Sequence, residues 1–461
     1  MSEFEIQAIS PVDGRYSPKV TQLRSFYSEM GYIEYRVIVE IEWLKKILTI
    51  PELKLPPVTQ RGMTHLDRIM TGFSVGDALR VKEIEARTNH DVKAIEYYVK
   101  ERLEETPETA CLKEFVHFTC TSEDINNLAQ GLAIRDSFSQ VIIPRIESFI
   151  VALSKLSQTS AAVPLLALTH GQPATPTTFG REMAVFVHRL KLQITSLRST
   201  AIRGKFNGAT GSFNAHSIAF PNIDWESVSR DFVEKSLRLV YQPMSTQIES
   251  HDYIAELCDS LSRISTILIG FSRDMWMYIS RGVLKLKVVP GEVGSSTMPH
   301  KVNPIDFENA EGNFGIANAL LNFFAQKLPI SRLQRDLSDS TVLRNLGVGF
   351  AHFLIAIDSL LKGVNKVAVD ENFCAVELNR NWSVLAEPIQ TIMRKAGIDK
   401  PYEKLKEVTR GTEIDQEGVS RFLETLAGKI SQDDMRVLQQ LTPATYVGIA
   451  EKLTLEYGVY P

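Results

Sequence analysis

Cysteine is scarce in this chain of 461 residues. The sequence holds four cysteines, none of which forms a Cys-x-x-Cys pair, namely Cys111, Cys120, Cys258 and Cys374. Few and widely spaced cysteines are typical of a protein from a reducing compartment. We therefore expect reduced, buried thiols in a cytoplasmic protein.

The chain also has no surplus of basic residues. Lys and Arg number 51 against 55 Asp and Glu, which gives a formal net charge of -4. Nucleic-acid binders normally draw their affinity from a basic surplus, so no nucleic-acid partner is expected, whereas a local pocket for a small anion is compatible with this balance. No run approaches the ~18 apolar residues of a membrane helix, and the acidic start Met-Ser-Glu-Phe-Glu-Ile is unlike a secretory signal. We expect no membrane partner.

Several familiar motifs are missing. The sequence has no Gly-x-Gly-x-x-Gly after a strand, no Walker A loop, no Gly-x-Ser-x-Gly elbow and no His-Glu-x-x-His. Its nine histidines show no metal-site spacing. We therefore expect neither a metal nor a cofactor.

Helical periodicity dominates what is present, while strand signals are sparse. Apolar residues recur at alternating steps of three and four in the stretches 142–156, 187–201, 254–278 and 354–364. Long helices with such stripes bury them against one another, so the sequence predicts an all-α fold built on a long-helix bundle. Apolar neighbours such as Ile267 and Ile269 widen one stripe, which favours association of bundles between subunits.

The chain divides into three helical regions by this pattern. We expect an N-terminal helical domain at 1–111, a central long-helix bundle with the catalytic loops at 112–364, and a C-terminal helical domain at 365–461, where Gly and Pro break shorter helical patterns.

A polar loop precedes one predicted helix. Glycines and serines between 291 and 296 let the backbone approach a ligand, and the segment then reads as a helix start. Asn303 suits the N-cap, Pro304 the first helical position and Asp306 the third. A helix N-terminus beside Lys301 favours an anion, although a well-capped surface loop explains the same pattern.

Three further clusters are polar. His170 lies among hydroxyls, an amide and two prolines that restrict the backbone, and a histidine is the natural proton carrier near neutral pH. Thr121 and Asp124 form a capping box at a second helix start. Asn89, His90 and Asp91 lie at the mouth of another helical run. Structural roles, as a loop histidine or as plain helix caps, remain open for these clusters.

An arginine cluster completes the polar set. Arg335 and Arg344, with Ser340 between them, offer the donors that grip a phosphate, although exposed arginines on a polar helix face show the same pattern. Two anion sites, a phosphate-type cluster and one histidine together indicate a substrate with carboxylates and a phosphate. Without a cofactor motif, the chemistry is expected to be proton transfer.

These segments resemble a known family. The run Ser295-Ser296-x-Met298-Pro299-x-Lys301-x-Asn303, with Glu308 beyond it, resembles the signature loop of the fumarase/aspartase superfamily. Within it, the segments 121–127, 169–176 and 335–341 are similar to those of the bacterial adenylosuccinate lyase family. The similarity extends from Pro11 to Leu405.

The resemblance implies a homotetramer whose helices form a joint bundle, with active sites shared between subunits. It implies β-elimination of fumarate from adenylosuccinate, giving AMP, and from the succinyl-carboxamide ribotide SAICAR, giving AICAR, in purine nucleotide biosynthesis. In this scheme Ser295 is the general base and His170 the general acid.

The resemblance also implies a set of substrate-binding residues. The succinyl carboxylates are assigned to Thr121, Ser122, Ser296, Lys301 and Asn303. The phosphate is assigned to Arg15, Tyr16, Arg335, Ser340 and Arg344. Contacts to base and ribose are assigned to Asn89, His90, Asp91 and Gln247, and His117 is expected to support the carboxylate or His170.

Other functions compete with this interpretation. Another lyase of the superfamily, acting on argininosuccinate, fumarate or malate, or aspartate, shares the signature loop. A structural protein on the same scaffold, or a nucleotide-binding regulator without turnover, would keep parts of the pattern. Fumarate release from adenylosuccinate separates these alternatives.

Overall fold

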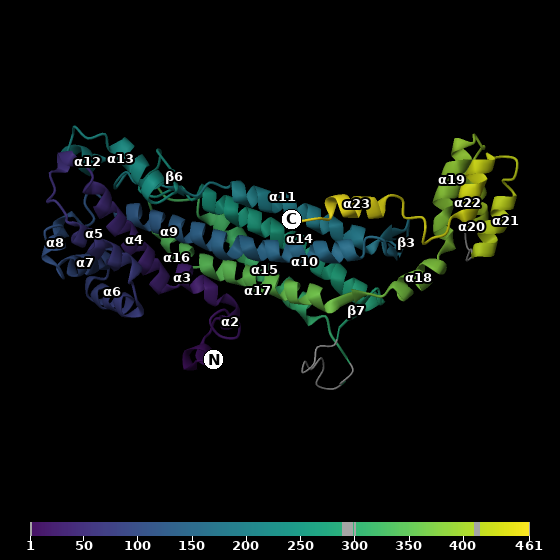
Figure 1. Ribbon diagram of the computed structural model, residues 1–461, viewed down its shortest axis with the longest axis horizontal. Coiled ribbons are helices and arrows are strands. Elements are labelled where there is room, and N and C mark those ends of the chain that lie inside the picture. Colours follow the sequence, from purple (N-terminus) through teal and green to yellow (C-terminus); the bar gives the residue numbers. More distant parts are fainter. Residues whose placement is uncertain (1, 288–297, 299–300, 410–414, 461) are drawn as a thin grey trace. The chain divides into compact units, whose positions relative to one another are not determined.

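The computed structural model describes residues 2–287, 298, 301–409 and 415–460 (Figure 1). These residues divide into two compact units. Unit 1 consists of Met1–Ile146, Ile194–Thr266 and Gly312–Ala356, and unit 2 of Glu147–Gln193, Ile267–Glu311 and Ile357–Pro461.

Helices dominate the described chain, as the apolar periodicity predicted. Those before the first unit boundary are α1 (Glu3–Gln7), α2 (Ser17–Val20), α3 (Arg24–Tyr27), α4 (Glu29–Ile47), α5 (Gln60–Thr71), α6 (Val75–Thr88), α7 (Asp91–Leu103), α8 (Pro107–Ala110) and α9 (Ser122–Ser137). Unit 1 also contains α12 (Asn214–Ala219), α13 (Trp225–Asp231) and α16 (Ser338–Leu343).

Long helices contribute residues to both units. They are α10 (Ile143–Thr159), α11 (Phe179–Ser199), α14 (Asp252–Arg281), α15 (Ile305–Lys327) and α17 (Leu346–Lys366). The predicted stripes lie on four of them, and Leu257, Leu261, Ile264 and Leu268 of α14 are buried. The all-α fold class and the long helices are therefore confirmed, whereas the three-region division stays a prediction.

The described strands are two or three residues long, in keeping with the sparse strand signals. They form the antiparallel pairs β1 (Pro164–Leu165) with β4 (Thr177–Thr178), β2 (Leu168–Thr169) with β3 (Gln172–Pro173), and β7 (Leu284–Leu286) with β8 (Val367–Val369), and the parallel pair β5 (Arg203–Gly204) with β6 (Val240–Tyr241). Each pair connects short segments and does not extend into a larger sheet.

Unit 1 has an aromatic core around α4. Trp43 is fully buried, and its ring lies 4.3 Å from that of Phe206 and 5.1 Å from that of Phe232, centroid to centroid. Trp43 Nε1 donates to the carbonyl of Phe118 at 2.9 Å. A buried tryptophan needs such a partner for its N–H, so α4 both fills the core and holds the turn before α9.

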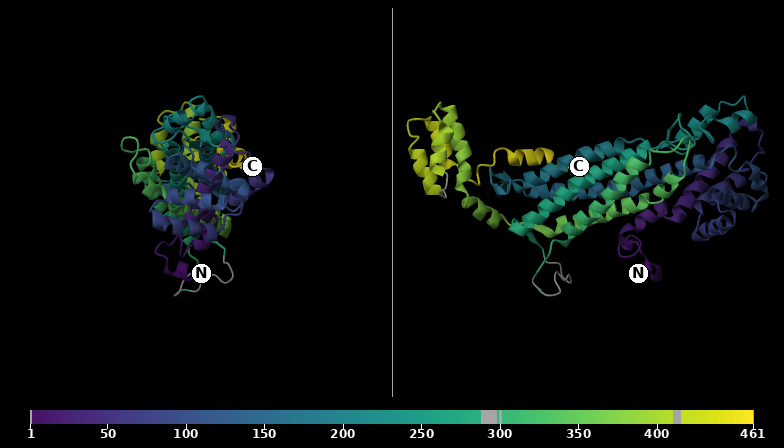
Figure 2. Two further views of the ribbon diagram at one scale, coloured as in Figure 1. Left: turned by 90° about the vertical axis from the view of Figure 1, so that its left-hand side faces the viewer. Right: turned by 180° about the vertical axis from the view of Figure 1, so that it is seen from behind.

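Unit 2 has its own packed interior. The Phe271 ring of α14 meets Phe149, Phe186 and Phe307 at centroid distances of 5.6, 5.2 and 6.3 Å. The C-terminal helices α18 (Glu371–Asn379), α19 (Ala386–Lys395), α20 (Pro401–Thr409), α21 (Gln416–Glu424), α22 (Gln432–Gln440) and α23 (Ala450–Tyr457) belong to the same unit. Of these, α19 to α22 group around a separate apolar cluster (Figures 1 and 2).

Two local expectations need correction. Helix α15 begins at Ile305, so Pro304 lies at the N-cap rather than at the first helical position, because its carbonyl accepts from the amides of Phe307 at 3.0 Å and Glu308 at 3.3 Å. The four cysteines were expected to be buried, but only Cys258 and Cys374 are, whereas Cys120 is half-buried. Cys111 is exposed, because it lies just beyond the end of the short helix α8 at the surface.

One described helical segment, Ser338–Lys366, is long and apolar enough to cross a bilayer by length and composition alone. In its most apolar window, 72% is buried inside the protein. Burial of this kind is typical of a core helix, which makes the segment a weak indication of a membrane span.

Candidate active site

Helix α9 begins where the capping pattern predicted. Its first residue is Ser122 and its N-cap is Thr121, whose backbone N–H donates to the Asp124 carboxylate at 2.9 Å. Thr121 and Ser122 are half-buried. A helix N-terminus carries unpaired N–H groups and the positive end of the helix dipole, so this end of α9 can hold a carboxylate.

A fully buried ion pair holds this helix start. Lys205 Nζ lies 2.8 Å from Asp124 Oδ1, and neither side chain has any exposed surface. The same carboxylate accepts from the backbone N–H groups of Asn207 at 3.1 Å and Gly208 at 3.2 Å. Lys205 Nζ also donates to the Gly208 carbonyl at 3.0 Å. Gly208 has φ +85°, a conformation that L side chains rarely adopt, so the turn requires glycine.

A buried histidine adjoins this pair. His216 is fully buried among the rings of Phe206, Phe213 and Trp225, and neither of its ring nitrogens has a hydrogen-bond partner among the described residues. Burial lowers the pKa of His216 to about 4, with nearby Lys205 acting in the same direction. The ring is therefore neutral at physiological pH and acts as packing.

Two arginines meet at Asp91, the first residue of α7. Arg36 Nη2 lies 3.0 Å and Arg344 Nη2 3.2 Å from Asp91 Oδ2, and Arg344 also pairs with Glu29 at 3.2 Å. Burial works to raise the pKa of the Asp91 carboxyl, but Arg36, the Val92 amide and Arg344 outweigh it and hold that pKa below its usual value. Asp91 is thus a carboxylate that orders two cations.

The polar contacts continue from Arg36 to Arg335, the other arginine of the cluster that the sequence predicted. Arg36 Nε donates to Asn126 Oδ1 at 2.9 Å, and Asn126 Nδ2 donates to Glu123 Oε1 at 2.7 Å. Glu123 also pairs with Arg335 Nη2 at 2.9 Å, and Arg335 Nη1 donates to Gln247 Oε1 at 3.2 Å. We call this set the arginine network: Arg344, Asp91, Arg36, Asn126, Glu123, Arg335 and Gln247.

Asn89 and His90 lie at the edge of the arginine network, between α6 and α7. Asn89 ends α6 in the left-handed conformation, with φ +51°. His90 is the N-cap of α7, and its Nδ1 accepts from the Lys93 backbone N–H at 3.1 Å. This bond leaves Nδ1 without a proton, so the neutral His90 ring carries its proton on Nε2.

His117 lies in the turn before α9, with φ +61°. Its Nδ1 is 2.6 Å from Oε1 of Glu40, and its backbone N–H donates to Oε2 of the same carboxylate at 3.2 Å. Burial works to lower the pKa of the His117 ring, but the charge and hydrogen bond of Glu40 outweigh it and raise that pKa above its ordinary value. Glu40 therefore orients the imidazole and stabilises its protonated form.

The remaining predicted phosphate ligands lie in unit 1. Arg15 is exposed and Tyr16 half-buried in the turn before α2, and Lys19 Nζ lies 5.8 Å from the Tyr16 ring centroid. Ser340 belongs to α16, and its backbone N–H donates to Asp339 Oδ1 at 2.7 Å. The described partners of Arg335 and Arg344 are Gln247, Glu123, Glu29 and Asp91, and Arg15 is not among them.

His170 lies in unit 2, at the tip of the two-residue hairpin that joins β2 to β3. His170 has φ +53° and Gly171 φ +72°, which matches the turn that two-residue hairpins favour. The side chain is exposed. The hairpin thus presents the imidazole away from the core of its unit.

The other unit 2 predictions lie around the start of α15. Lys301 is exposed and Asn303 half-buried just before the helix. Ser295 and Ser296 lie outside the described residues. Glu308, in the first turn of α15, accepts from Trp276 Nε1 at 3.0 Å.

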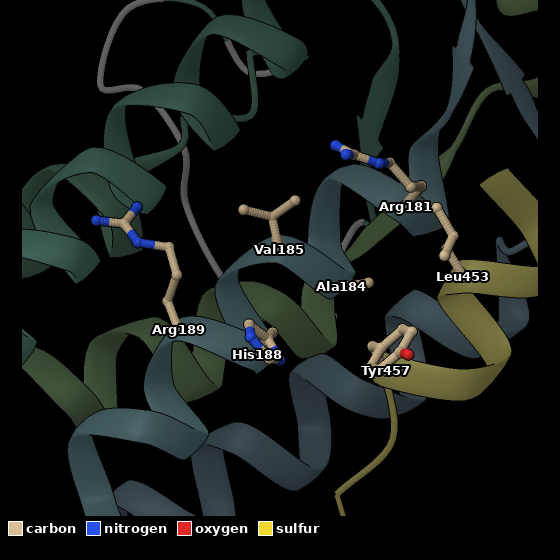
Figure 3. A pocket seen from close by; sticks show the side chains of 7 residues that line it. All are labelled: Arg181, Ala184, Val185, His188, Arg189, Leu453 and Tyr457. Atoms are coloured by element: carbon tan, nitrogen blue, oxygen red, sulfur yellow. The ribbon is translucent and has the colours of Figure 1, made fainter. Parts of the chain in front are cut away.

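A cavity in unit 2 contains none of the predicted site residues. It has a volume of about 340 Å³ and lies between α11 and α23, lined by Arg181, Ala184, Val185, His188, Arg189, Leu453 and Tyr457 (Figure 3). Its His188 and Tyr457 rings meet edge to face, 6.2 Å apart.

The structure thus brings together part of the predicted set. Asp91, Gln247, Arg335 and Arg344 share the arginine network, and Thr121 and Ser122 start the helix that carries its Glu123 and Asn126. His170, Lys301 and Asn303 belong to the other unit. Within the described residues, no group of three His, Cys, Asp or Glu side chains is arranged to hold a metal.

Sequence reasoning missed four residues that organise this site: Arg36, Glu40, Glu123 and Lys205. Arg36 and Glu40 lie on one helix at positions that are buried, at 7% and 1% exposure. Charged residues four apart on a helix are usually read as a solvated face. Arg36 and Glu40 lie among the apolar residues Ile33, Val37, Ile41 and Leu44, and this apolar setting is the signal that could have identified them as buried.

Comparison with known proteins agrees with this architecture. Residues 14–317 match the lyase family, and residues 331–447 match the family of adenylosuccinate lyase C-terminal domains. The chain is 51% identical to adenylosuccinate lyase of Vibrio cholerae over 450 residues, which covers 97% of this chain and 98% of that protein. The chain belongs to the adenylosuccinate lyase family. The predicted membership of the fumarase/aspartase superfamily is thereby confirmed, and the chain is a lyase.

A further relative and two solved structures agree with this family and fold. The adenylosuccinate lyase of Escherichia coli K12 is 51% identical over 451 residues, covering 98% of each chain. Among solved structures, a fumarate lyase from Mesorhizobium sp. BNC1 has a TM-score of 0.76 at 18% identity, covering 95% of this chain and 97% of that one. A 3-carboxy-cis,cis-muconate lactonizing enzyme from Pseudomonas putida has a TM-score of 0.72 at 19% identity, covering 95% and 96%. At such low identity these two structures show the fold alone.

The buried pair predicts a large stability effect. Lys205→Met should destabilise the protein by about 3–5 kcal/mol, because it leaves Asp124 charged, buried and without its cation. Urea unfolding followed by circular dichroism measures the effect. The control Lys235→Met removes a lysine whose side chain is 77% exposed beside Asp231, and should leave the unfolding midpoint unchanged. Equal midpoints for Lys205→Met and the parent would contradict the role given to the pair.

Proposed function

We propose that the chain cleaves adenylosuccinate to AMP and fumarate, and SAICAR to AICAR and fumarate, in purine nucleotide biosynthesis. The observation that carries this proposal is the arginine network, which joins Asp91, Gln247, Arg335 and Arg344 from separate segments of unit 1 beside the start of α9. Two ordered guanidinium groups near a helix N-terminus suit a substrate with a phosphate and carboxylates. The 51% identity to adenylosuccinate lyases over nearly the whole chain supports the same assignment.

The state of Arg335 supports a phosphate at the network. Its Nε–H is buried and has no hydrogen-bond partner within the described chain, while its two terminal nitrogens bond Gln247 and Glu123. An unpaired buried donor costs free energy. A bound phosphate that draws the guanidinium toward itself would relieve this cost. Arg15, Tyr16 and Ser340 are proposed as further phosphate ligands, and Asn89 and His90 as contacts of base and ribose.

The proposed reaction is a β-elimination. A base takes the proton from the carbon beside one succinyl carboxylate, and the electron pair of that C–H bond forms the new C=C bond of fumarate. The C–N bond breaks, its electron pair stays on nitrogen, and an acid protonates that nitrogen. Ser295 is the proposed base and His170 the proposed acid.

Stabilisation of the intermediate charge is the main task of the site. Loss of the carbon-bound proton leaves a second negative charge that spreads into the adjacent carboxylate. Lys301, Asn303, Ser296, Thr121 and Ser122 are the proposed donors to the succinyl carboxylates. Donors that bind the dianion more tightly than the substrate lower the barrier, and Lys301 would equally favour an oxyanion on Ser295. No cofactor or metal takes part in this scheme.

A homotetramer with shared active sites is proposed as the working assembly, in the cytoplasm. The long helices carry large apolar side chains at their surface, for example Ile316 at 48% and Phe323 at 50% exposure on α15, and Trp276 at 43% on α14. Exposed apolar residues in such numbers mark association surfaces. Shared sites would also unite His170 of unit 2 with the arginine network of unit 1 by way of neighbouring subunits.

Turnover tests the proposed base and acid. The parent should release fumarate from adenylosuccinate, and Ser295→Ala and His170→Asn should each lower kcat on the order of 10²–10⁴-fold. Asparagine is the matched replacement at position 170 because it tolerates the positive φ of the hairpin tip. Fumarate formation followed by absorbance measures the rate. Near-parental turnover by either variant would refute that assignment, and a parent that releases no fumarate would refute the function. Malate, aspartate and argininosuccinate serve as substrates for the competing lyase activities.

Binding of AMP tests the phosphate site. Arg344→Met should weaken AMP about 10–100-fold, because it removes a charge-assisted hydrogen bond. Arg344 is exposed, so this change leaves no buried charge unpaired. The control Arg87→Met removes an exposed arginine at the end of α6 and should bind AMP as the parent does. Isothermal titration calorimetry measures both, and parental affinity in Arg344→Met would place the phosphate elsewhere.

The assembly has its own test. Light scattering after size exclusion should give four times the mass of one chain for the parent, and a smaller species for Phe323→Asp at low concentration. Ile218→Asp, at a position 85% exposed on α12, should keep the parental mass. A monomeric parent would exclude sites shared between subunits.

A further inference from the structure

Glu40 is a fully buried carboxylate whose hydrogen bonds within the described residues all come from His117. Its two oxygens accept from the ring Nδ1 at 2.6 Å and from the backbone N–H at 3.2 Å. Glu40 is 1% exposed, and the side chain of His117 is 17% exposed. Burying a carboxylate is costly unless it is paired and hydrogen-bonded, so this contact is a specific feature of the fold rather than a surface pairing.

The backbone around His117 is held in an unusual shape by the same helix. His117 and Thr119 both have φ +61°, which is uncommon for residues other than glycine. Between them, the Phe118 carbonyl accepts from Trp43 Nε1 at 2.9 Å. Glu40 and Trp43 are three residues apart on α4 and therefore lie on one face. Two side chains of α4 thus fix the turn and the direction of the His117 ring.

The free edge of the ring is Nε2. Since Nδ1 bonds Glu40, Nε2 is the other ring nitrogen, and it has no hydrogen-bond partner within the described residues. His117 lies four residues before Thr121, the N-cap of α9, where a substrate carboxylate is proposed. A ring fixed at one nitrogen and free at the other can donate from Nε2 to an anion in a defined direction.

The charges that face the ring favour its cationic form. Glu40 of α4 makes the largest favourable contribution, and Glu96 of α7 and Asp124 of α9 add to it at longer range. Glu96 is itself paired with Lys93 and Lys100, and Asp124 with Lys205, which weakens their effect. Glu40 has no cation other than His117 within the described chain.

We propose that Glu40 is a positioning residue of the active site, which holds His117 with Nδ1–H on the carboxylate and keeps the ring as an imidazolium whose Nε2–H binds an anionic group of the substrate. This inference rests on the proposed function. The ring would offer a full positive charge and a directed donor to a phosphate or carboxylate oxygen, without transferring a proton during the reaction.

The arrangement makes substrate binding depend on pH. His117 is a group with a raised pKa, so its cationic form persists above the ordinary pKa of histidine and disappears as the pH rises through the raised value. KM for adenylosuccinate should therefore rise on the alkaline side. Removing the Glu40 charge should move this rise to lower pH by about one unit or more, the effect expected of an opposite charge in direct contact.

The test measures kcat and KM between pH 5.5 and 9 for the parent and for Glu40→Gln, which keeps the size of the side chain and loses its charge. At a pH one unit above the altered pKa, the cationic fraction and hence substrate affinity should fall about tenfold, while kcat changes less than KM. The control Glu42→Gln removes a carboxylate of the same helix that pairs with Lys45, and should keep the parental profile. The substrate phosphate ionises in the same way in the assays of all three proteins, so it does not contribute to differences between their pH profiles.

A second variant covers the case in which Glu40→Gln does not fold. His117→Gln removes the ionisable ring and leaves Glu40 in place, and its KM should lack the alkaline rise. A parental pH profile in either folded variant would overturn the proposal. A change in melting temperature with an unchanged profile would assign Glu40 to stability alone, which also overturns it. Failure of the parent to release fumarate would instead overturn the proposed function.

Discussion

The ion pair of Lys205 with Asp124 is the interaction on which the described site depends. Two charges removed from water remain favourable only when other dipoles complete their hydrogen bonding, and the amides of Asn207, Gly208 and Thr121 do so here. Because the same carboxylate caps α9, the pair also determines where that helix begins. The position of Thr121 and Ser122 therefore follows from a lysine that lies more than eighty residues further along the chain.

Local patterns made the helices and their caps predictable. Steps of three and four place Leu257, Leu261, Ile264 and Leu268 on one face of α14, so the buried face could be read directly. A cap and its partner are three residues apart, which is why Thr121 and Asp124 could be paired. At the start of α15, where Pro304 instead of Asn303 precedes the first helical residue, local reasoning missed the cap by one residue.

Contacts between distant residues were beyond such reasoning. Arg36 meets a carboxylate 55 residues away and an amide 90 residues away, and Glu40 meets a histidine 77 residues away. The buried apolar residues around Arg36 and Glu40 indicate that these charges are buried, but no local pattern identifies partners so far along the chain. The roles of His170, Lys301 and the arginines were therefore inferred from chemistry and resemblance, and the hairpin that carries His170 could have been read from the His-Gly dipeptide, which suits a two-residue turn.

The long helices that serve both units constrain how this protein can change in length. Each helical residue turns the chain by about 100°, so one insertion within α14 would rotate every later side chain of that helix off its stripe. An insertion before Phe271 would turn its ring away from the aromatic residues that it contacts, although none of these residues had been replaced. Insertions and deletions should therefore accumulate in the connecting segments, and the spacing between the polar clusters would persist even where the apolar residues themselves drift.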